Sequence, residues 1–442
     1  MDRERTQFGT KAIDRSTFLK GAAATGAALA AASSLPLRPA MAASSSVVYW
    51  QFFTGGDGVR MTQMQKDFSA ANPSIHLTAT TLTWGAPFYT KLTTATVVGK
   101  GPNIASMHLT RLGAFVASGL VTPLDLPTLA TYGITPDKFS AVQWKKAQFN
   151  GVQYAVPLDT HPFVLYYNTD ICKKAGLLDA SGKLKPLVGA NAVLNAFKAV
   201  QKVTGKYGMA IDSQDVMPWR LFYTLYSQQG GKIISADGKT MVIDDAKAIT
   251  ALTWMAELCS GNVAPNNAAY ADAVSMFASG KAGFHWNGDW EATTFQTSKT
   301  PYDITLTPNV LGTMATQADS HSLIIPKQKS LSSSQLAANL TCISSLVKDS
   351  LVWAEGGHIP AYLPVATSSA YKALNPQSHY AGEAAYATYD PDAWWSGSGS
   401  QMETDAGGYF SSVMAGHATP AKALAQFKAD IQKFINTPQP TS

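Results

Sequence analysis

The chain has 442 residues, 46% of them hydrophobic and only 14% charged, and its formal net charge is +5. This length is too great for one compact core, so two structural units are expected. The sparse charge contains no run of Lys or Arg that could follow a phosphate backbone, which argues against nucleic acid as a partner. Ten Trp are present, and although most aromatic residues are expected in the core, such rings suit sugar surfaces.

The first 42 residues have the pattern of an export signal. Basic residues are spread over 1–20, and the Ala-rich apolar stretch at 21–32 is too short to span a bilayer. Small residues at Ala40 and Ala42 match a signal-peptidase site, so we place cleavage after Ala42. The run at 15–20 resembles a twin-arginine signal with Ser in place of the second Arg. We therefore expect a soluble protein in the periplasm or outside the cell.

The rest of the chain alternates strand and helix patterns. Residues 47–53 are β-branched and aromatic, a glycine-rich turn follows at 54–58, and 59–71 has a helical pattern. Strand patterns return at 75–80 and 104–108. This order indicates an α/β fold. Ligands of such sheets bind beyond the carboxyl ends of the strands, which here are the loops at 54–57, 83–87 and 108–111.

Cysteine spacing and short motifs exclude several kinds of site. Cys172, Cys259 and Cys342 lie far apart, without the spacing of a zinc site, so no structural metal is indicated. At most one disulfide can form among them, and buried free thiols account for them equally well. A P-loop would need Gly at position 233, where Ile233 stands, and no other cofactor is indicated.

The last third differs in composition. Residues 380–408 are rich in Tyr, Trp, Gly and Ser, which is typical of an ordered surface loop or a cleft wall. Residues 420–435 have the pattern of a closing amphipathic helix.

Several segments occur in an order that resembles a known family. The segment 150–157 has a Gly-x-x-Tyr-x-x-Pro pattern, and 165–177 is the most specific stretch. Together these segments resemble the extracellular solute-binding proteins of ABC importers, in the sugar-binding branch that includes maltose-binding protein. The family's Pro-x-Thr-Trp motif is absent after Leu178, and 366–408 matches no family pattern. The matching segments are 49–58, 68–75, 101–124, 150–157, 165–177, 277–290 and 356–361.

The resemblance implies the periplasmic-binding-protein fold, with a ligand cleft between two discontinuous α/β lobes. We expect an N-terminal lobe of 43–157 plus 302–350 and a C-terminal lobe of 158–301 plus 351–442. The implied function is the substrate-binding component of an ABC importer, which captures a neutral mono- or oligosaccharide by lobe closure and has no catalytic residues. Its partners would be a permease and an ATPase in separate chains, and the protein itself a monomer.

Candidate ligand contacts come from the predicted loops and from the family motifs. Trp290 follows an Asn-Gly motif at the position where the family often stacks a ring on a sugar, and Trp84 lies in a predicted loop. Thr110 and Arg111 stand where related sugar binders use an acid and an arginine. The aromatic candidates are Phe53, Trp84, Trp219, Trp290, Trp394 and Trp395. The other candidates are Thr54, Asp57, His108, Thr110, Arg111, Asp159, His161, Asp215, Asp289, Gly357 and His358.

Two other functions remain open at this stage. A secreted glycosidase would need two acids at a fixed separation, and the chain contains neither a Gly-x-Ser-x-Gly nor a His-Glu-x-x-His motif. A binder of a polyamine, iron or a phosphorylated polyol would share the fold. A strongly charged cleft would suit polyamines or phosphates, and the nearly neutral charge favours a neutral sugar.

Overall fold

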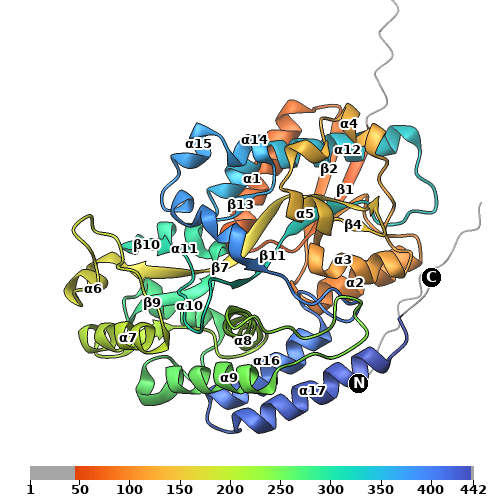
Figure 1. Cartoon of the computed structure of the whole chain (residues 1–442). Helices are drawn as coiled ribbons and strands as arrows, with labels where there is room; N and C mark the ends of the chain where they lie inside the picture. Colours follow the sequence, from red (N-terminus) through yellow and green to blue (C-terminus); the bar gives the residue numbers. More distant parts are fainter. Residues whose placement is uncertain (1–44, 440–442) are drawn as a thin grey trace, which may run out of the picture. The chain divides into compact units, whose positions relative to one another are not determined.

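A computed structural model describes residues 45–439, so the predicted export signal lies outside the described residues (Figure 1). The first of its two large sheets has the strand order β2-β1-β3-β12-β6. The strands β1, β2 and β3 are parallel, as the predicted strand–helix–strand unit requires, and β12 runs antiparallel to both of its neighbours. The strands are β1 (Ser45–Gln51), β2 (Ile75–Thr81), β3 (Ile104–His108), β12 (His321–Ile324) and β6 (Ala155–Pro157).

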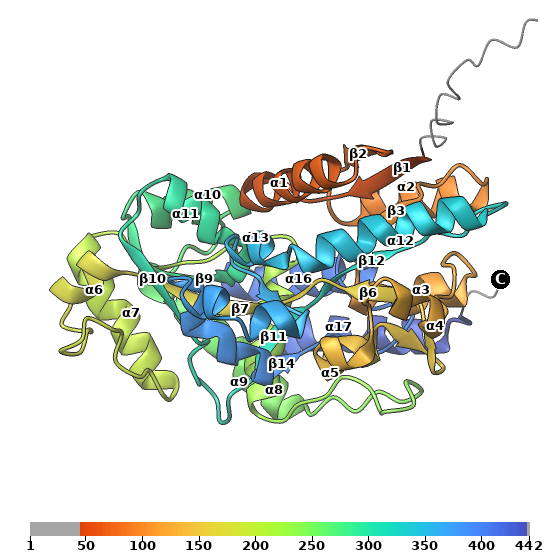
Figure 2. The same ribbon diagram turned by 90° about the horizontal axis from the view of Figure 1, so that it is seen from above.

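The first sheet forms because alternate residues of its strands enter one core. In β1, Val47, Tyr49 and Gln51 are buried, whereas the residues between them are partly exposed. Helix α12 packs against β1, and α1 packs against α12 and α13 (Figure 2). The helices around this sheet are α1 (Gly55–Ala71), α2 (Ala86–Val97), α3 (Leu109–Ala117), α4 (Leu126–Thr131), α5 (Ala141–Lys146), α12 (Ser333–Lys348) and α13 (Ser350–Ala354). A 3-10 turn, η1 (Pro136–Lys138), and a small hairpin, β4 (Gln148–Phe149) with β5 (Val152–Gln153), complete it.

The second sheet is built around β7 (Asp159–Asn168), all of whose residues are buried. Its order is β14-β11-β7-β9-β8, and β10 and β13 also pair with β7. A strand covered on both faces and paired along both edges has no alternating pattern, which explains the continuous apolar and aromatic run at 162–167 within this segment. The other strands are β8 (Tyr207–Ala210), β9 (Ala282–Gly288), β10 (Tyr302–Thr305), β11 (Thr316–Asp319), β13 (Ile359–Pro360) and β14 (Ala387–Thr388).

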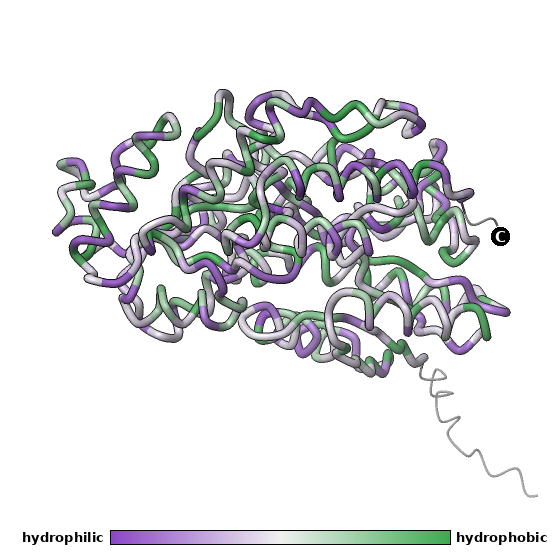
Figure 3. The backbone as a smooth tube through the Cα atoms, turned by 90° about the horizontal axis from the view of Figure 1, so that it is seen from below, coloured by the Kyte–Doolittle hydropathy of each residue, from purple (hydrophilic) through white to green (hydrophobic). Residues whose placement is uncertain are grey.

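Helix α8 (Met217–Gln228) forms the centre of the second lobe, and every one of its residues is buried. It packs against α9, α16 and β11, and α17 packs on α9 and α16. Helix α17 buries one stripe, Ala423, Leu424, Phe427 and Ile431, so hydrophobic and hydrophilic residues alternate along such outer helices (Figure 3). The other helices here are α6 (Thr169–Lys174), α7 (Ala190–Thr204), α9 (Asp245–Cys259), α10 (Tyr270–Ala278), α11 (Ala292–Thr297), α16 (Gln401–Met414) and α17 (Pro420–Asn436). Two short helices, α14 (Leu363–Ala366) and α15 (Ser369–Lys372), pack against α13, and Val365 of α14 packs on the first core. The 3-10 segments are η2 (Ser260–Asn262), η3 (Asp289–Glu291) and η4 (Gln377–Tyr386).

Three connections carry the chain between the sheets. Leu158 separates β6 of the first sheet from β7 of the second, and Ser320 separates β11 from β12. A third connection follows α13 and includes β13. The sequence-based division assigned 302–350 to the N-terminal lobe, but β10 and β11 pair with β7, so the return to the first sheet begins at His321. A strand pattern alone does not show which partner a strand takes.

Two further expectations are resolved by the structure. All three cysteines are free thiols, with Cys172 and Cys259 in the second core and Cys342 in the first. The segment 380–408, expected to be an ordered surface loop or a cleft wall, is partly exposed around Tyr386, whereas Tyr380 and the residues from Trp395 to Ser400 are buried and α16 begins at Gln401.

Adjacent glycines in α16 provide a test of the packing in the second lobe. A Cβ on Gly407 would lie 1.8 Å from the Asp215 carbonyl oxygen, whereas a Cβ on Gly408 would contact nothing. We expect Gly407→Ala to lower the free energy of unfolding by ~2 kcal/mol through overpacking. Gly408→Ala should raise it by up to ~1 kcal/mol through helix propensity. Urea denaturation of both variants measures this, and equal midpoints would contradict the packing described here.

Candidate functional site

A cavity of about 400 Å³ lies between the two sheets, beyond the carboxyl ends of β1 and β3. Its position agrees with the rule for open α/β sheets, and all three loops chosen from the sequence contribute residues to its lining. The first sheet and its loops contribute Phe52, Phe53, Thr54, Gly55, Gly56, Asp57, Trp84, His108 and His321. The second contributes His161, Asp212, Asp215, Val216, Met217, Arg220, Tyr270, Trp290, Glu291 and Thr294.

Two tryptophans from opposite sides of the cavity face one arginine. The guanidinium carbon of Arg220 lies 5.5 Å from the ring centre of Trp84 and 5.6 Å from that of Trp290. The Trp290 indole N–H donates to the Tyr270 hydroxyl at 2.6 Å, which fixes the ring. These contacts place a cationic hydrogen-bond donor beside both flat apolar ring surfaces, one from each sheet.

Carboxyl groups also line the cavity. Asp57 lies in the first turn of α1, since the predicted glycine turn is the start of that helix, and Asp215 adopts a positive φ of 49°. Asp212 accepts a hydrogen bond from the Gln214 N–H at 2.8 Å, and burial raises its pKa to about 7. Burial likewise raises the pKa of Glu291, which accepts from the Tyr270 hydroxyl. The cavity can therefore accept hydrogen bonds from several directions.

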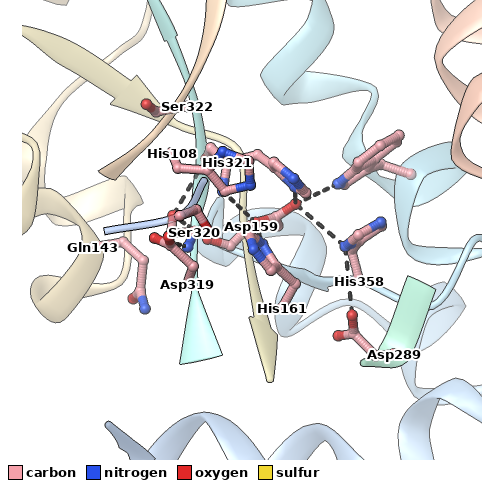
Figure 4. Close-up of polar contacts among 12 residues, drawn as sticks. His108, Gln143, Asp159, His161, Asp289, Asp319, Ser320, His321, Ser322 and His358 are labelled. Carbon is pink, nitrogen blue, oxygen red and sulfur yellow. Dashed lines mark hydrogen bonds and ion pairs between the residues drawn. The ribbon is translucent and has the colours of Figure 1, made fainter. Parts of the chain in front are cut away.

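Histidines form the floor of the cavity, and each has one ring nitrogen held by a neighbour (Figure 4). His108 Nδ1 lies 2.6 Å from the Tyr89 hydroxyl. His161 Nδ1 and His321 Nδ1 lie 3.0 and 2.7 Å from the two oxygens of Asp159, and the two rings stack at 4.0 Å. Burial, and then the neighbouring His321, lower the pKa of His161 to about 3, so it is neutral and donates its Nδ1–H to Asp159.

His358 lies behind this floor and does not line the cavity. Its Nε2 is 2.9 Å from an Asp57 oxygen, and its ring stacks on Trp353 at 4.2 Å. Its Nδ1 faces Asp159 Oδ2 at 3.4 Å and Asp289 Oδ1 at 3.6 Å (Figure 4). Burial opposes a charge on His358, but Asp57 and Asp159 outweigh it and raise the pKa of the imidazole to about 9. Burial raises the pKa of Asp289 well above its usual range.

The structure brings about half of the predicted ligand contacts to one cavity. Asp159, Asp289 and His358 support its floor from behind. Gly357, with a φ of 127°, allows close approach to the Asp289 carbonyl oxygen, from which a Cβ would be 1.8 Å away. The predicted contacts that line the cavity are Phe53, Thr54, Asp57, Trp84, His108, His161, Asp215 and Trp290.

The remaining predicted contacts lie outside the cavity, and their partners explain why. The Thr110 hydroxyl donates to Asp319, and Arg111 lies over the Tyr89 ring and donates to the Ser396 carbonyl. Trp219 is fully buried because α8 is covered on all sides, and its indole N–H donates to Asp390. Trp395 stacks on Phe434, and Trp394 packs against the second core.

Sequence reasoning missed several residues of the cavity. Arg220 is a lone charge in an otherwise uncharged helix, and His321 lies in a polar run at 319–322 just before Leu323 and Ile324, so both carried a signal. The other missed residues, Phe52, Asp212, Val216, Met217, Tyr270, Glu291 and Thr294, carry none in the sequence.

The chain matches a family model described as bacterial extracellular solute-binding protein over residues 63–373. It is 26% identical over 210 residues to an arabinooligosaccharide-binding protein of Bacillus subtilis, covering 47% of this chain and 46% of that protein. It is 23% identical over 237 residues to a putative binding protein of Brucella abortus, covering 52% of this chain and 54% of that protein. The chain thus spans about half the length of the curated relatives it matches.

Solved structures share the fold over nearly the whole of their length. The GacH receptor of Streptomyces glaucescens has a TM-score of 0.76 at 17% identity, covering 89% of this chain and 98% of the receptor. A maltose-bound MalE3 of T. maritima has a TM-score of 0.76 at 16% identity, covering 88% of this chain and 99% of MalE3. Lmo0181 of Listeria monocytogenes, in complex with cycloalternan, has a TM-score of 0.75 at 19% identity, covering 89% and 100%. The predicted two-sheet α/β fold is confirmed.

Within residues 45–439, none of the helices has the length and apolar character that crossing a membrane requires.

The raised pKa of Asp212 predicts a pH-dependent stability difference. The folded-state pKa of about 7 exceeds the reference value of 3.8, so the folded protein keeps a proton that the unfolded chain releases. The free energy of unfolding therefore falls as pH rises between these values. Asp212→Asn keeps the acceptor for the Gln214 N–H. Its free energy of unfolding should be higher than that of the wild type by ~1 kcal/mol or more at pH 8 and by much less at pH 4. Denaturant titrations at both pH values test this, and a pH-independent difference would show that Asp212 is ionised in the fold.

Proposed function

Since this chain belongs to the bacterial extracellular solute-binding protein family, we propose that it is the binding component of an ABC importer and captures a neutral carbohydrate between its lobes. Proteins of this family bind solutes and are not catalysts, so no catalytic residue is assigned. A permease and an ATPase in separate chains would receive the ligand. The protein would act as a monomer after export to the periplasm or the cell exterior.

The observation that carries this proposal is the pair of tryptophans that face one cavity from the two lobes. A sugar has an apolar ring face, which stacks on an indole, and a rim of hydroxyl groups, which needs donors and acceptors. Trp84 and Trp290 supply the rings, and Arg220 supplies donors beside them. Asp57, Asp212, Asp215 and Glu291 supply acceptors.

Related proteins support the same ligand class. The Bacillus relative is named for arabinooligosaccharides, and the similar structures are described with maltose, acarbose and cycloalternan. A cavity of about 400 Å³ lies in the usual range for small-molecule sites.

Lobe closure would occur about the connections at Leu158 and Ser320. Each is a single residue between two strands, so small changes in backbone angles there move one sheet relative to the other. We propose that the two lobes move relative to each other as rigid bodies and that the chain returns to the N-terminal lobe at His321.

The ligand class is tested by thermal shift of residues 43–442 against sugars, polyols, polyamines and ferric iron, with sugar products assayed in the same wells. A ligand present at a hundred times its Kd should add about 2.7 kcal/mol to stability. We expect a shift with one class of sugar and no turnover. Product formation would overturn the binding role, and a shift with iron or polyamine alone would overturn the sugar assignment.

Single substitutions test the aromatic walls. Trp84→Ala and Trp290→Ala should each weaken binding of that sugar at least ~10-fold, equivalent to about 1.4 kcal/mol, because each removes a stacking face. Trp290→Phe, which keeps a ring, should retain more affinity than Trp290→Ala. Trp50→Ala is the control, since Trp50 lies outside this cavity beside Lys91. Calorimetric titration measures all four, and unchanged affinity in both alanine variants would place the sugar elsewhere.

A further inference from the structure

Two buried carboxyl groups lie behind Arg220, the arginine that lines the cavity from α8. They belong to Glu403, in the first turn of α16, and to Asp390, in the loop that follows β14. Helices α8 and α16 pack against each other (Figure 1). Glu403 is fully buried, Asp390 is 2% exposed and Arg220 is 6% exposed. The three side chains therefore form a charged group that is almost entirely removed from solvent.

Each of the two carboxyl groups has one oxygen that accepts from N–H donors and one that accepts from none. Asp390 Oδ1 accepts from the Trp219 indole N–H at 3.1 Å and from the Gln317 amide at 3.4 Å. Glu403 Oε2 accepts from the Gly399 N–H at 2.7 Å. No N–H or O–H group of the described chain donates to Asp390 Oδ2 or Glu403 Oε1. Since a buried carboxylate oxygen without a donor is disfavoured, both groups lack one donor.

A proton held between the two groups supplies this donor. The side chains of Glu403 and Asp390 are hydrogen-bonded to each other, which requires a proton on one of them. Burial raises the pKa of Glu403 well above its usual range, although Arg220 opposes this, and burial also raises the pKa of Asp390. Two acids coupled in this way titrate as a pair.

The charges around the pair account for one proton and not two. The other charged groups that interact with the pair are Arg220, Arg111 and Asp319. Burial raises the pKa of Asp319 to about 6, so this carboxyl group is still ionised at pH 7. The guanidinium groups stay protonated, so one shared proton leaves two negative charges against two positive ones. The nearby tyrosines, Tyr89 and Tyr223, stay neutral because burial raises their pKa.

Helix capping explains only part of this arrangement. Ser400 and Glu403 have the spacing of a capping box, and the Ser400 hydroxyl accepts from the Glu403 N–H at 3.2 Å. Glu403 Oε2 serves the same helix start through the Gly399 N–H. Glu403 Oε1 has no part in the cap and lies 3.8 Å from Arg220 Nε, which is itself buried without a hydrogen bond in the described chain. The second oxygen therefore acts on Arg220.

Arg220 reaches the cavity with its charge already balanced. Its Nη2 donates to Ser398 Oγ at 3.3 Å, and its guanidinium lies beside Trp84 and Trp290. An arginine that has a buried counter-charge gains little from an anionic ligand and can still donate to a hydroxyl group. Without the counter-charge, the same guanidinium would favour a carboxylate or a phosphate.

We propose that Glu403 and Asp390 share one proton and one negative charge, which balances Arg220 and makes the cavity select uncharged carbohydrates against uronic acids and phosphorylated polyols. Glu403 and Asp390 are positioning residues, because they act through Arg220 and do not line this cavity. The selection among carbohydrates rests on the proposed function, whereas the shared proton does not.

Amide substitutions test the shared proton by urea denaturation. In Glu403→Gln or Asp390→Asn, the amide NH₂ takes the place of the proton and the other carboxylate keeps the charge. We expect each variant to unfold at a higher urea concentration than the wild type at pH 8 and at nearly the same concentration at pH 4. The reason is that the folded wild type keeps a proton that its unfolded chain releases as pH rises. The double variant should unfold at a lower concentration than either single variant at both pH values, because Arg220 loses its counter-charge.

Three results would overturn the shared proton. The first is a lower urea midpoint than the wild type for both single variants at pH 8. The second is a double variant as stable as the single ones. The third is a gain in the single variants that is equal at pH 4 and pH 8, since this would mean that both carboxyl groups are ionised in the fold.

Anion binding tests the selection, with galacturonate and inorganic phosphate as probes in calorimetric titrations of residues 43–442 at constant ionic strength. We expect the double variant to bind each probe at least ~10-fold more tightly than the wild type, because its Arg220 lacks a counter-charge. Glu383→Gln is the control, since Glu383 is a buried glutamate that accepts from the Thr307 N–H and does not line this cavity. It should bind both probes as the wild type does.

Equal affinity of the wild type and the double variant for both anions would overturn the selection by Glu403 and Asp390, and so would a gain of the same size in Glu383→Gln. Neither probe is a neutral sugar, so these results do not depend on the sugar screen. A screen in which no sugar binds would overturn the ligand class and would leave the urea and anion measurements to decide the role of the pair.

Discussion

The carboxylate of Asp159 is the point on which the arrangement of the two sheets depends. It lies one residue after the connection at Leu158 and is fully buried. It accepts hydrogen bonds from His161 beyond the first connection, from His321 beyond the second, and from the Trp353 indole just before the third. Because a buried carboxylate needs all of its hydrogen bonds, each connection is held in register with the other two.

The cavity follows from this arrangement. Fixing the connections places the carboxyl ends of β1 and β3 opposite α8 and η3, so side chains distant in sequence meet. Two cavity residues of the second lobe are held in place by their own neighbours. The Trp290 ring is held by Tyr270, and the loop that carries Asp215 is held against Gly407 of α16. The floor of the cavity carries side chains of both sheets, His108 and His321 from the first and His161 from the second.

Much of the fold could be predicted from the sequence, because a strand or helix pattern is visible within the short segment that forms the element. The strands predicted at 75–80 and 104–108 and the helix predicted at 420–435 are present as β2, β3 and α17. Trp84 was chosen because a large ring in a loop is poorly explained by packing, and Trp290 because of its position in the family motif; both line the cavity. The placement of 302–319, by contrast, depends on pairing with β7, which leaves no mark in the pattern of those residues. Trp219 was misplaced because its helix is covered on every side, and Arg111 because a Tyr89 ring and a Ser396 carbonyl engage it.

The three connections have a consequence for how such a protein can change over time. Each lobe is assembled from segments on both sides of the connections, so no single cut in the gene separates one lobe from the other. Exchanging one half for that of a relative would require several simultaneous recombination events, each preserving the contacts of Asp159. New specificity is therefore more readily acquired by point substitutions in the cavity wall, and the two halves are inherited as one unit.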